Sequence, residues 1–146
     1  MIQRIQTIFL LLAAGALGSL FALPFATTEA AEAKGIFTDS VYNLHDNIGL
    51  MILVGFGILV ALISMFSFKN RIRQMRFGYL GMILSILVPV TAFLYFTSQI
   101  EKMDESQHTA DALGIVAPFV ALVFFIAANR FIKKDDKLVR SMDRLR

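Results

Sequence analysis

Two histidines are the side chains of this sequence best suited to hold a metal ion or a haem. Carboxylates lie close to both of them in the sequence, at Asp46, Asp104, Glu105 and Asp111. Two imidazoles with carboxylates can bind zinc, and two imidazoles can be the axial ligands of a haem. The spacing of His45 and His108 matches no established ligand pattern for either group. We therefore expect solvated loop histidines, with no metal and no cofactor bound.

The rest of the chain offers no recognisable catalytic machinery. The sequence contains no cysteine, so thiol nucleophiles, cysteine-ligated zinc and a dithiol redox relay are excluded. It also lacks the G-x-S-x-G, H-E-x-x-H and P-loop motifs that place a nucleophile, a metal or a phosphate. We expect no catalytic residues and a protein that is not an enzyme. An enzyme or cofactor protein that uses the two histidines is kept as an alternative.

Twelve of the fourteen basic residues fall into three groups that apolar sequence separates. The groups are Arg4, then Lys69, Arg71, Arg73 and Arg76, then Arg130, Lys133, Lys134, Lys137, Arg140, Arg144 and Arg146. The other two, Lys34 and Lys102, lie in the alternate segments, together with eight of the eleven acidic residues. Because Lys and Arg are retained on the cytoplasmic side during membrane insertion, we expect both termini and residues 69–76 on that side.

Four uncharged apolar runs lie between these charges: Ile5–Thr28, Ile48–Phe68, Phe77–Ser98 and Ala112–Asn129. A helix rises ~1.5 Å per residue, so each run is long enough, or nearly so, to cross ~30 Å of hydrocarbon. Lipid offers the backbone no hydrogen-bond partners, so each run must be helical. The chain is 57% hydrophobic and only 17% charged, whereas a soluble domain is about a quarter charged.

The sequence therefore predicts an all-α integral membrane four-helix bundle with both termini cytoplasmic. We expect helices over residues 3–27, 46–69, 74–99 and 109–134, which leave residues 1–146 as a single transmembrane domain. The expected location is the bacterial inner membrane. The first run could instead be a cleaved signal peptide, with a cleavage site within Ala26–Ala33, but it is longer than the usual apolar region and contains Pro24.

Prolines lie inside the third and fourth runs, at Pro89 and Pro118. A proline within a helix removes a backbone donor and clashes with the preceding turn, so we expect both helices to kink. Kinked helices could line a channel or a small-solute transporter if several copies assembled, which is our alternative function. No ionisable residue lies at mid-depth in any run, and this argues against a proton-coupled carrier.

The sequence after the fourth run predicts a basic helical extension over residues 133–146. Leu138, Met142 and Leu145 follow an i, i+4, i+7 pattern, so the extension has an apolar stripe on a basic helix. Such a helix could lie on anionic lipid or dock on a protein. The basic segment at 69–76 could also touch nucleic acid, although the retention of cations on the cytoplasmic side explains it without such a partner.

Three separated motifs on the expected cytoplasmic side give the chain a resemblance to a known family. They are Met1–Thr7, then Lys69-Asn70-Arg71 with Gln74 and Arg76, then Leu138–Arg146. In these motifs the chain resembles a domain-of-unknown-function family of small four-helix inner-membrane proteins found in Bacteroidota. The resemblance spans the whole chain and implies no catalytic residue.

We expect the cytoplasmic face to act as an accessory or scaffolding surface that contacts membrane lipids, a protein partner or a second copy of the chain. The residues expected at such a contact are Arg4, Lys69, Asn70, Arg71, Gln74, Arg76, Arg140, Ser141, Asp143, Arg144 and Arg146.

Overall fold

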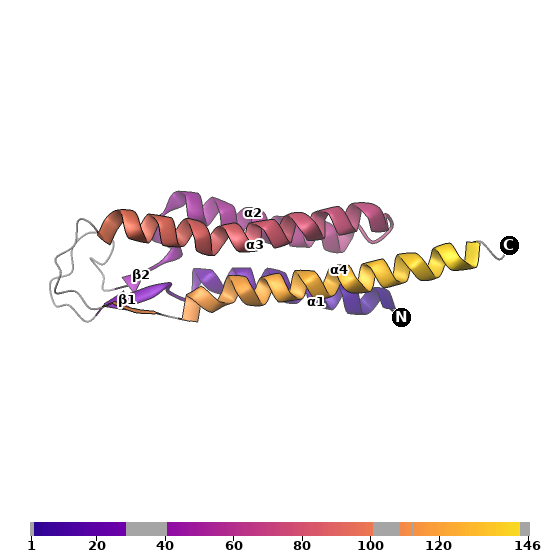
Figure 1. The fold of residues 1–146 in the computed structure, drawn as a ribbon, viewed down its shortest axis with the longest axis horizontal. Coiled ribbons are helices and arrows are strands. Elements are labelled where there is room, and N and C mark those ends of the chain that lie inside the picture. Colours follow the sequence, from indigo (N-terminus) through magenta and orange to yellow (C-terminus); the bar gives the residue numbers. More distant parts are fainter. Residues whose placement is uncertain (1, 29–40, 101–108, 112, 144–146) are drawn as a thin grey trace.

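The computed structural model of the protein describes residues 2–28, 41–100, 109–111 and 113–143. Its four long helices are α1 (Ile2–Gly18), α2 (Ile48–Phe66), α3 (Arg71–Ile100) and α4 (Val116–Asp143). Successive helices run in opposite directions, and α1 packs against α4 as well as against α2 (Figure 1). The expected all-α arrangement of four helices is therefore confirmed for the described residues, as an antiparallel bundle.

A small antiparallel sheet, which the sequence did not predict, lies at one end of the bundle (Figure 1). Its strands are β1 (Ala26–Thr28), β2 (Val41–Tyr42) and β3 (Thr109–Asp111), in the order β2-β1-β3. Ala26 pairs with Tyr42 on one side and with Asp111 on the other. Strands of two or three residues are too short to show the alternating pattern by which a strand is recognised in a sequence. We call this the sheet end of the bundle.

The first and fourth helices are shorter at the sheet end than we expected. The helix expected over 3–27 ends at Gly18, followed by a 3-10 turn, Ser19–Phe21, and then by β1. The helix expected from 109 begins at Val116, after a second 3-10 turn, Leu113–Ile115. The two shortened regions meet where the Gly114 N–H donates to the Pro24 carbonyl at 2.9 Å.

The position of α4 also changes the interpretation of Pro118. This proline lies in the first turn of the helix, where a backbone N–H has no intrahelical acceptor in any case. The kink that we expected at Pro118 therefore does not follow. Pro89, in contrast, lies well inside α3.

Asparagine side chains fix where α2 and α3 begin. Asn47 Oδ1 accepts hydrogen bonds from the backbone N–H groups of Gly49 and Leu50, at 2.8 and 3.2 Å. Asn70 Oδ1 accepts from the N–H of Arg73 at 3.0 Å, so α3 starts at Arg71 and not near residue 74 as expected. Both are N-cap bonds, which satisfy donors that the helix itself leaves unpaired.

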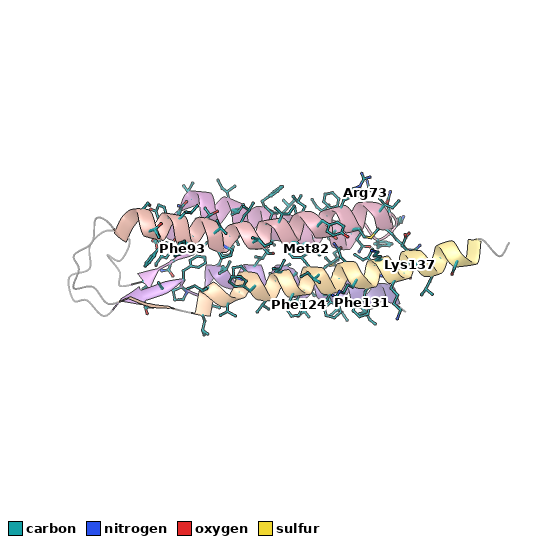
Figure 2. All side chains as sticks on the ribbon, in the orientation of Figure 1. Arg73, Met82, Phe93, Phe124, Phe131 and Lys137 are labelled. Atoms are coloured by element: carbon teal, nitrogen blue, oxygen red, sulfur yellow. The ribbon has the colours of Figure 1, made fainter. Side chains whose placement is uncertain are left out.

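The bundle is filled mainly by aliphatic side chains, with Leu10, Leu17, Leu50, Val54 and Phe125 all fully buried. Its outer surface is equally apolar (Figure 2). Each helix exposes more than half of a large aliphatic side chain, for example Ile8, Ile52, Ile83 and Val123. A soluble monomer rarely exposes such continuous apolar surface.

Among the described residues, three helical stretches are long and apolar enough to cross a membrane, judged by length and composition alone. They are Ile48–Phe66, Arg71–Ser98 and Leu113–Val139. The helical stretch Ile5–Phe21 is apolar but shorter. The apolar outer surface of the bundle and the lengths of these helices agree with the expectation of a membrane protein.

Candidate contact site at the basic end of the bundle

The end of the bundle opposite the sheet holds the N-terminus, the α2–α3 turn and the C-terminal part of α4 (Figure 1). We call it the basic end. Its exposed cations are Lys69, Arg73, Arg76, Arg130, Lys133, Lys134 and Lys137. Figure 2 shows Arg73 beside the α2–α3 turn and Lys137 on α4. The fold therefore brings all three basic groups of the sequence to one end. Lys69 and Lys134, for example, are 65 residues apart along the chain.

The α2–α3 turn is a compact hydrogen-bonded connection. Ser67 closes α2 through bonds from its N–H and its hydroxyl to the Ile63 carbonyl, at 3.0 and 2.7 Å. The Asn70 N–H then donates to the Ser67 carbonyl at 3.0 Å. Lys69 and Asn70 are exposed at the tip, but the Asn70 side chain is occupied as the N-cap of α3. The turn thus holds its cations on a rigid backbone.

Arg71 differs from the other cations because it is paired within the bundle. Its Nε lies 2.8 Å from Asp135 Oδ2, and the two side chains are 24% and 13% exposed. This ion pair joins the start of α3 to the C-terminal half of α4. Arg71 therefore links two helices. Its ion-pair partner, Asp135, was not among the residues that the sequence predicted at the contact site.

Gln74, which we expected at a contact surface, is buried at 1% exposure. It belongs to a layer of buried polar side chains with one member from each helix: Gln6, Ser64, Gln74 and Asn129. The Ser64 hydroxyl donates to the Gln74 carbonyl at 3.1 Å, and Asn129 Nδ2 donates to the Met75 carbonyl at 3.4 Å. The side chain of Gln74 is therefore not part of the bundle surface.

Three side-chain atoms of this layer have no hydrogen-bond partner among the described residues: Gln6 Nε2, Gln74 Oε1 and Asn129 Oδ1. Leaving a buried donor or acceptor unpaired costs about 1–3 kcal/mol. Each of these unpaired atoms thus lowers the free energy of unfolding of the bundle.

The C-terminal part of α4 continues the helix without a break beyond the ends of the other three helices (Figure 1). Ser141 is exposed and its hydroxyl donates to the Leu138 carbonyl at 2.8 Å, a bond within the helix. Leu138 is 45% exposed. Arg140 and Asp143 lie in the last turns of α4, whereas Arg144 and Arg146 lie outside the described residues. We call residues 133–143 the α4 extension.

Two other expectations concern residues at opposite ends of the bundle. Arg4 is in the first turn of α1, at the basic end. His45 is exposed at the sheet end, where its ring meets that of Phe21 edge to face at 6.0 Å. His108 lies outside the described residues. In the part of the chain that the structure describes, no three His, Asp or Glu side chains gather as metal ligands.

The sequence did contain a signal for the buried layer. Gln6 and Gln74 lie within the first two turns of their helices, and Ser64 lies in the last turn of α2. In an antiparallel bundle these positions share one depth, so polar residues at similar distances from one end indicate a common layer. The Arg71–Asp135 pair had no such signal, because it depends on how α3 and α4 rotate against each other.

Comparison with known proteins gives one match. The family described as domain of unknown function (DUF4293) matches residues 2–145. No curated protein and no solved structure matches the chain.

Proposed function

The chain belongs to the DUF4293 family of domains of unknown function, and because this membership names no activity, we propose a function from the structure: a non-enzymatic membrane protein that offers its basic end, above all the α4 extension, as a docking element for a cytoplasmic protein. The observation that carries the proposal is the continuous helix α4, which leaves the bundle as a basic projection (Figure 1).

The membrane location is supported by the surface of the bundle. Large aliphatic side chains are exposed on all four helices, and three helical stretches meet the length and hydropathy of a membrane span. Among the described residues, no Asp, Glu, Lys, Arg or His is buried in the bundle. Apolar side chains face lipid at no cost, whereas in water the same surface would drive aggregation.

The orientation is supported by where the cations gather. Seven exposed Lys and Arg side chains lie at the basic end. Because positive charge is retained on the cytoplasmic side, this gathering of cations supports a cytoplasmic location for the basic end and for both termini. The bacterial inner membrane is the location that we propose. The occurrence in Bacteroidota stays a prediction from the resemblance, because the family match does not test it.

The direction of α4 favours a protein partner over a lipid surface. A helix of 28 residues is roughly 42 Å long at ~1.5 Å per residue, which exceeds the ~30 Å of hydrocarbon. The last turns follow the long axis of the bundle (Figure 1). A helix that leaves the bilayer in this direction cannot lie flat on it. Its charges and the exposed Leu138 therefore face the cytoplasm.

Truncation after Lys134 tests the docking proposal. We expect the truncated chain to insert and fold like the full chain but to lose the proteins that co-purify with it in mild detergent. The double variant Lys137→Glu, Arg140→Glu should lose the same proteins, whereas Lys102→Glu, a charge change in the segment between α3 and α4, should keep them. If truncated and full-length chains retain the same proteins in equal amounts, the extension is only a topology signal and the proposal fails.

Trypsin distinguishes the protein partner from a lipid surface. In vesicles without the partner, the α4 extension should be cleaved after Lys137 equally fast with and without anionic phospholipid. Protection that appears only with anionic phospholipid would show that the extension lies on lipid, contrary to the proposal.

The transporter alternative requires several copies of the chain, and it stays a prediction. Within one copy, the centre of the bundle is filled by fully buried side chains, such as Leu17, Leu50 and Phe125.

A further inference from the structure

A pocket of about 490 Å³ opens at the sheet end of the bundle. Pocket residues come from the second half of α3, from the start of α4 and from the chain around β1 and β2. The buried side chains among them include Phe25 and Ala92, at 3% and 5% exposure. The volume lies within the range of about 300–1,000 Å³ that is typical of pockets for small molecules. The proposed function does not use this pocket.

The lining is almost entirely hydrocarbon. Among the described residues that line the pocket, Tyr42 is the only one with a polar side chain, and its hydroxyl already donates to the Ala92 carbonyl at 3.2 Å. The ring of Tyr42 is also held in place, because it packs against Phe25 and Phe96 with ring centroids 5.5 and 6.1 Å apart. The described residues of the lining therefore offer no unpaired polar side chain to recognise a headgroup or a polar substrate. Its occupant must be apolar where it lies inside.

The rim of the pocket belongs to the apolar outer surface of the bundle. Val90 and Phe93 on α3 are 47% and 65% exposed, and Phe119 on α4 is 52% exposed. Figure 2 shows Phe93 on α3 toward the sheet end. The flank where these residues lie is the one that lipid would cover in a membrane. An occupant can therefore enter sideways from the bilayer without crossing a polar barrier.

Small residues and a proline explain why space is left here. Ala92 and Ala26 lie in the lining, where a larger side chain would fill the volume. Pro89 also lines the pocket, and it deprives the Ser85 carbonyl of its usual backbone donor. The pocket is therefore a consequence of these particular residues, and not of loose packing throughout the bundle.

We propose that this pocket holds one acyl chain of a membrane phospholipid. Lipid chains surround the rim at the highest concentration of any apolar ligand, and the lining matches a flexible hydrocarbon and nothing more polar. An acyl chain in the pocket gives the lining atoms dispersion contacts that they lack beside an empty space. The proposal rests on the membrane location proposed above, but it does not depend on docking through the α4 extension.

The absence of tryptophan in the chain allows a direct test. In Phe25→Trp, the single indole lies at the buried wall of the pocket. In Phe56→Trp, on α2, it replaces a side chain that is 48% exposed on the outer surface. Both variants are reconstituted in phosphatidylcholine vesicles with brominated acyl chains, which quench indole fluorescence on contact. We expect quenching in both variants.

Two matched substitutions then separate the pocket from the surrounding lipid. Ala92→Leu fills the pocket, whereas Ala22→Leu adds the same atoms at an exposed residue outside the lining. Ala92→Leu should abolish most of the quenching of Phe25→Trp and leave that of Phe56→Trp unchanged. Ala22→Leu should change neither. The pocket proposal is wrong if Phe25→Trp shows no quenching, or if its quenching persists in the presence of Ala92→Leu. In either case, quenching of Phe56→Trp would still show that the protein is in the membrane.

A second measurement avoids the tryptophan variants altogether. Native mass spectrometry of the otherwise unaltered chain should show one retained phospholipid, which Ala92→Leu removes and Ala22→Leu keeps. Equal retention in the two alanine variants, or a retained molecule other than a phospholipid, would refute the proposal. If Phe56→Trp is not quenched either, the membrane location itself is wrong.

Discussion

Tyr42 contacts residues from several elements at the sheet end of the bundle. It lies in the short strand β2 and is only 2% exposed. Its hydroxyl reaches α3 at the Ala92 carbonyl, and its ring lies among those of Phe25, Tyr95 and Phe96. Burial raises the pKa of the Tyr42 hydroxyl above its ordinary value, and the nearby Tyr95 and Asp46 raise it further. The phenolate is thus disfavoured in the folded protein.

This pKa shift predicts a loss of stability in alkali. The unfolded chain releases the Tyr42 proton near the ordinary pKa of about 10, while the folded chain keeps it. Above that pH the unfolded state binds fewer protons, so the free energy of unfolding falls as pH rises from about 10 toward the higher folded pKa. The temperature of thermal unfolding in detergent should therefore fall more steeply above pH 10 in the parent chain than in Tyr42→Phe. Identical pH profiles would contradict the assignment.

The Arg71–Asp135 ion pair gives a second prediction at the residue scale. Its Nε–Oδ2 distance is 2.8 Å, and the two side chains are 24% and 13% exposed. Asp135→Asn should lower the free energy of unfolding by about 1 kcal/mol, at the upper end of surface ion pairs. Arg73→Gln, which removes an exposed cation two residues away, should change it little.

Exchanging the two charges provides the control for this pair. The double variant Arg71→Asp, Asp135→Arg should recover part of the loss seen in Asp135→Asn. Unfolding of the exchanged variant at an even lower temperature would mean that packing, and not the attraction of opposite charges, links the helices at this point.

Among the elements, α3 and α4 are in close contact at Gly81. A Cβ atom added there would collide with the ring of Phe125, which is fully buried. The ring therefore occupies the space that a side chain on α3 would need. The Gly81 carbonyl also accepts the Ser85 hydroxyl at 2.9 Å, so this turn of α3 is fixed on two sides.

Gly81→Ala should accordingly separate the two helices. Overpacking of this kind costs typically about 1–3 kcal/mol, which a lower unfolding temperature in detergent would reveal. Gly55→Ala on α2 is the control, because a Cβ there meets nothing within 4 Å and alanine is the better helix former. Adding Phe125→Leu to Gly81→Ala should recover stability. A Gly81→Ala chain as stable as Gly55→Ala would disprove the close contact.

For the whole molecule, the antiparallel bundle brings both termini to the basic end (Figure 1). Together with the distribution of Lys and Arg, this predicts that both termini are cytoplasmic. A reporter that is active only in the periplasm should be silent when fused after Arg146. The same reporter should be active when it is inserted between residues 29 and 40, in the part of the sequence between β1 and β2. Strong activity after Arg146 would reverse the topology.

Much of the fold was predictable from the sequence because hydropathy and helix length depend on neighbouring residues alone. The four apolar runs specified four helices. The contact site was predictable only in part. The exposure of Lys69 and Arg76 agrees with their expected place at a surface, and this exposure is a consequence of charge that needs no tertiary information.

What only the tertiary structure decided depends on residues distant in the sequence. Gln74 became buried because neighbouring helices pack against α3, and Arg71 became an internal link because α4 presents Asp135 at the right rotation. The sheet formed because β1, β2 and β3 meet only once the helices are paired, and the apolar pocket exists because Pro89, Ala92 and Phe25 converge there. The sequence by itself determined the helices, their expected direction and the charge of each end. The neighbours of each side chain were decided by packing, since a contact between two helices depends on both rotations at once.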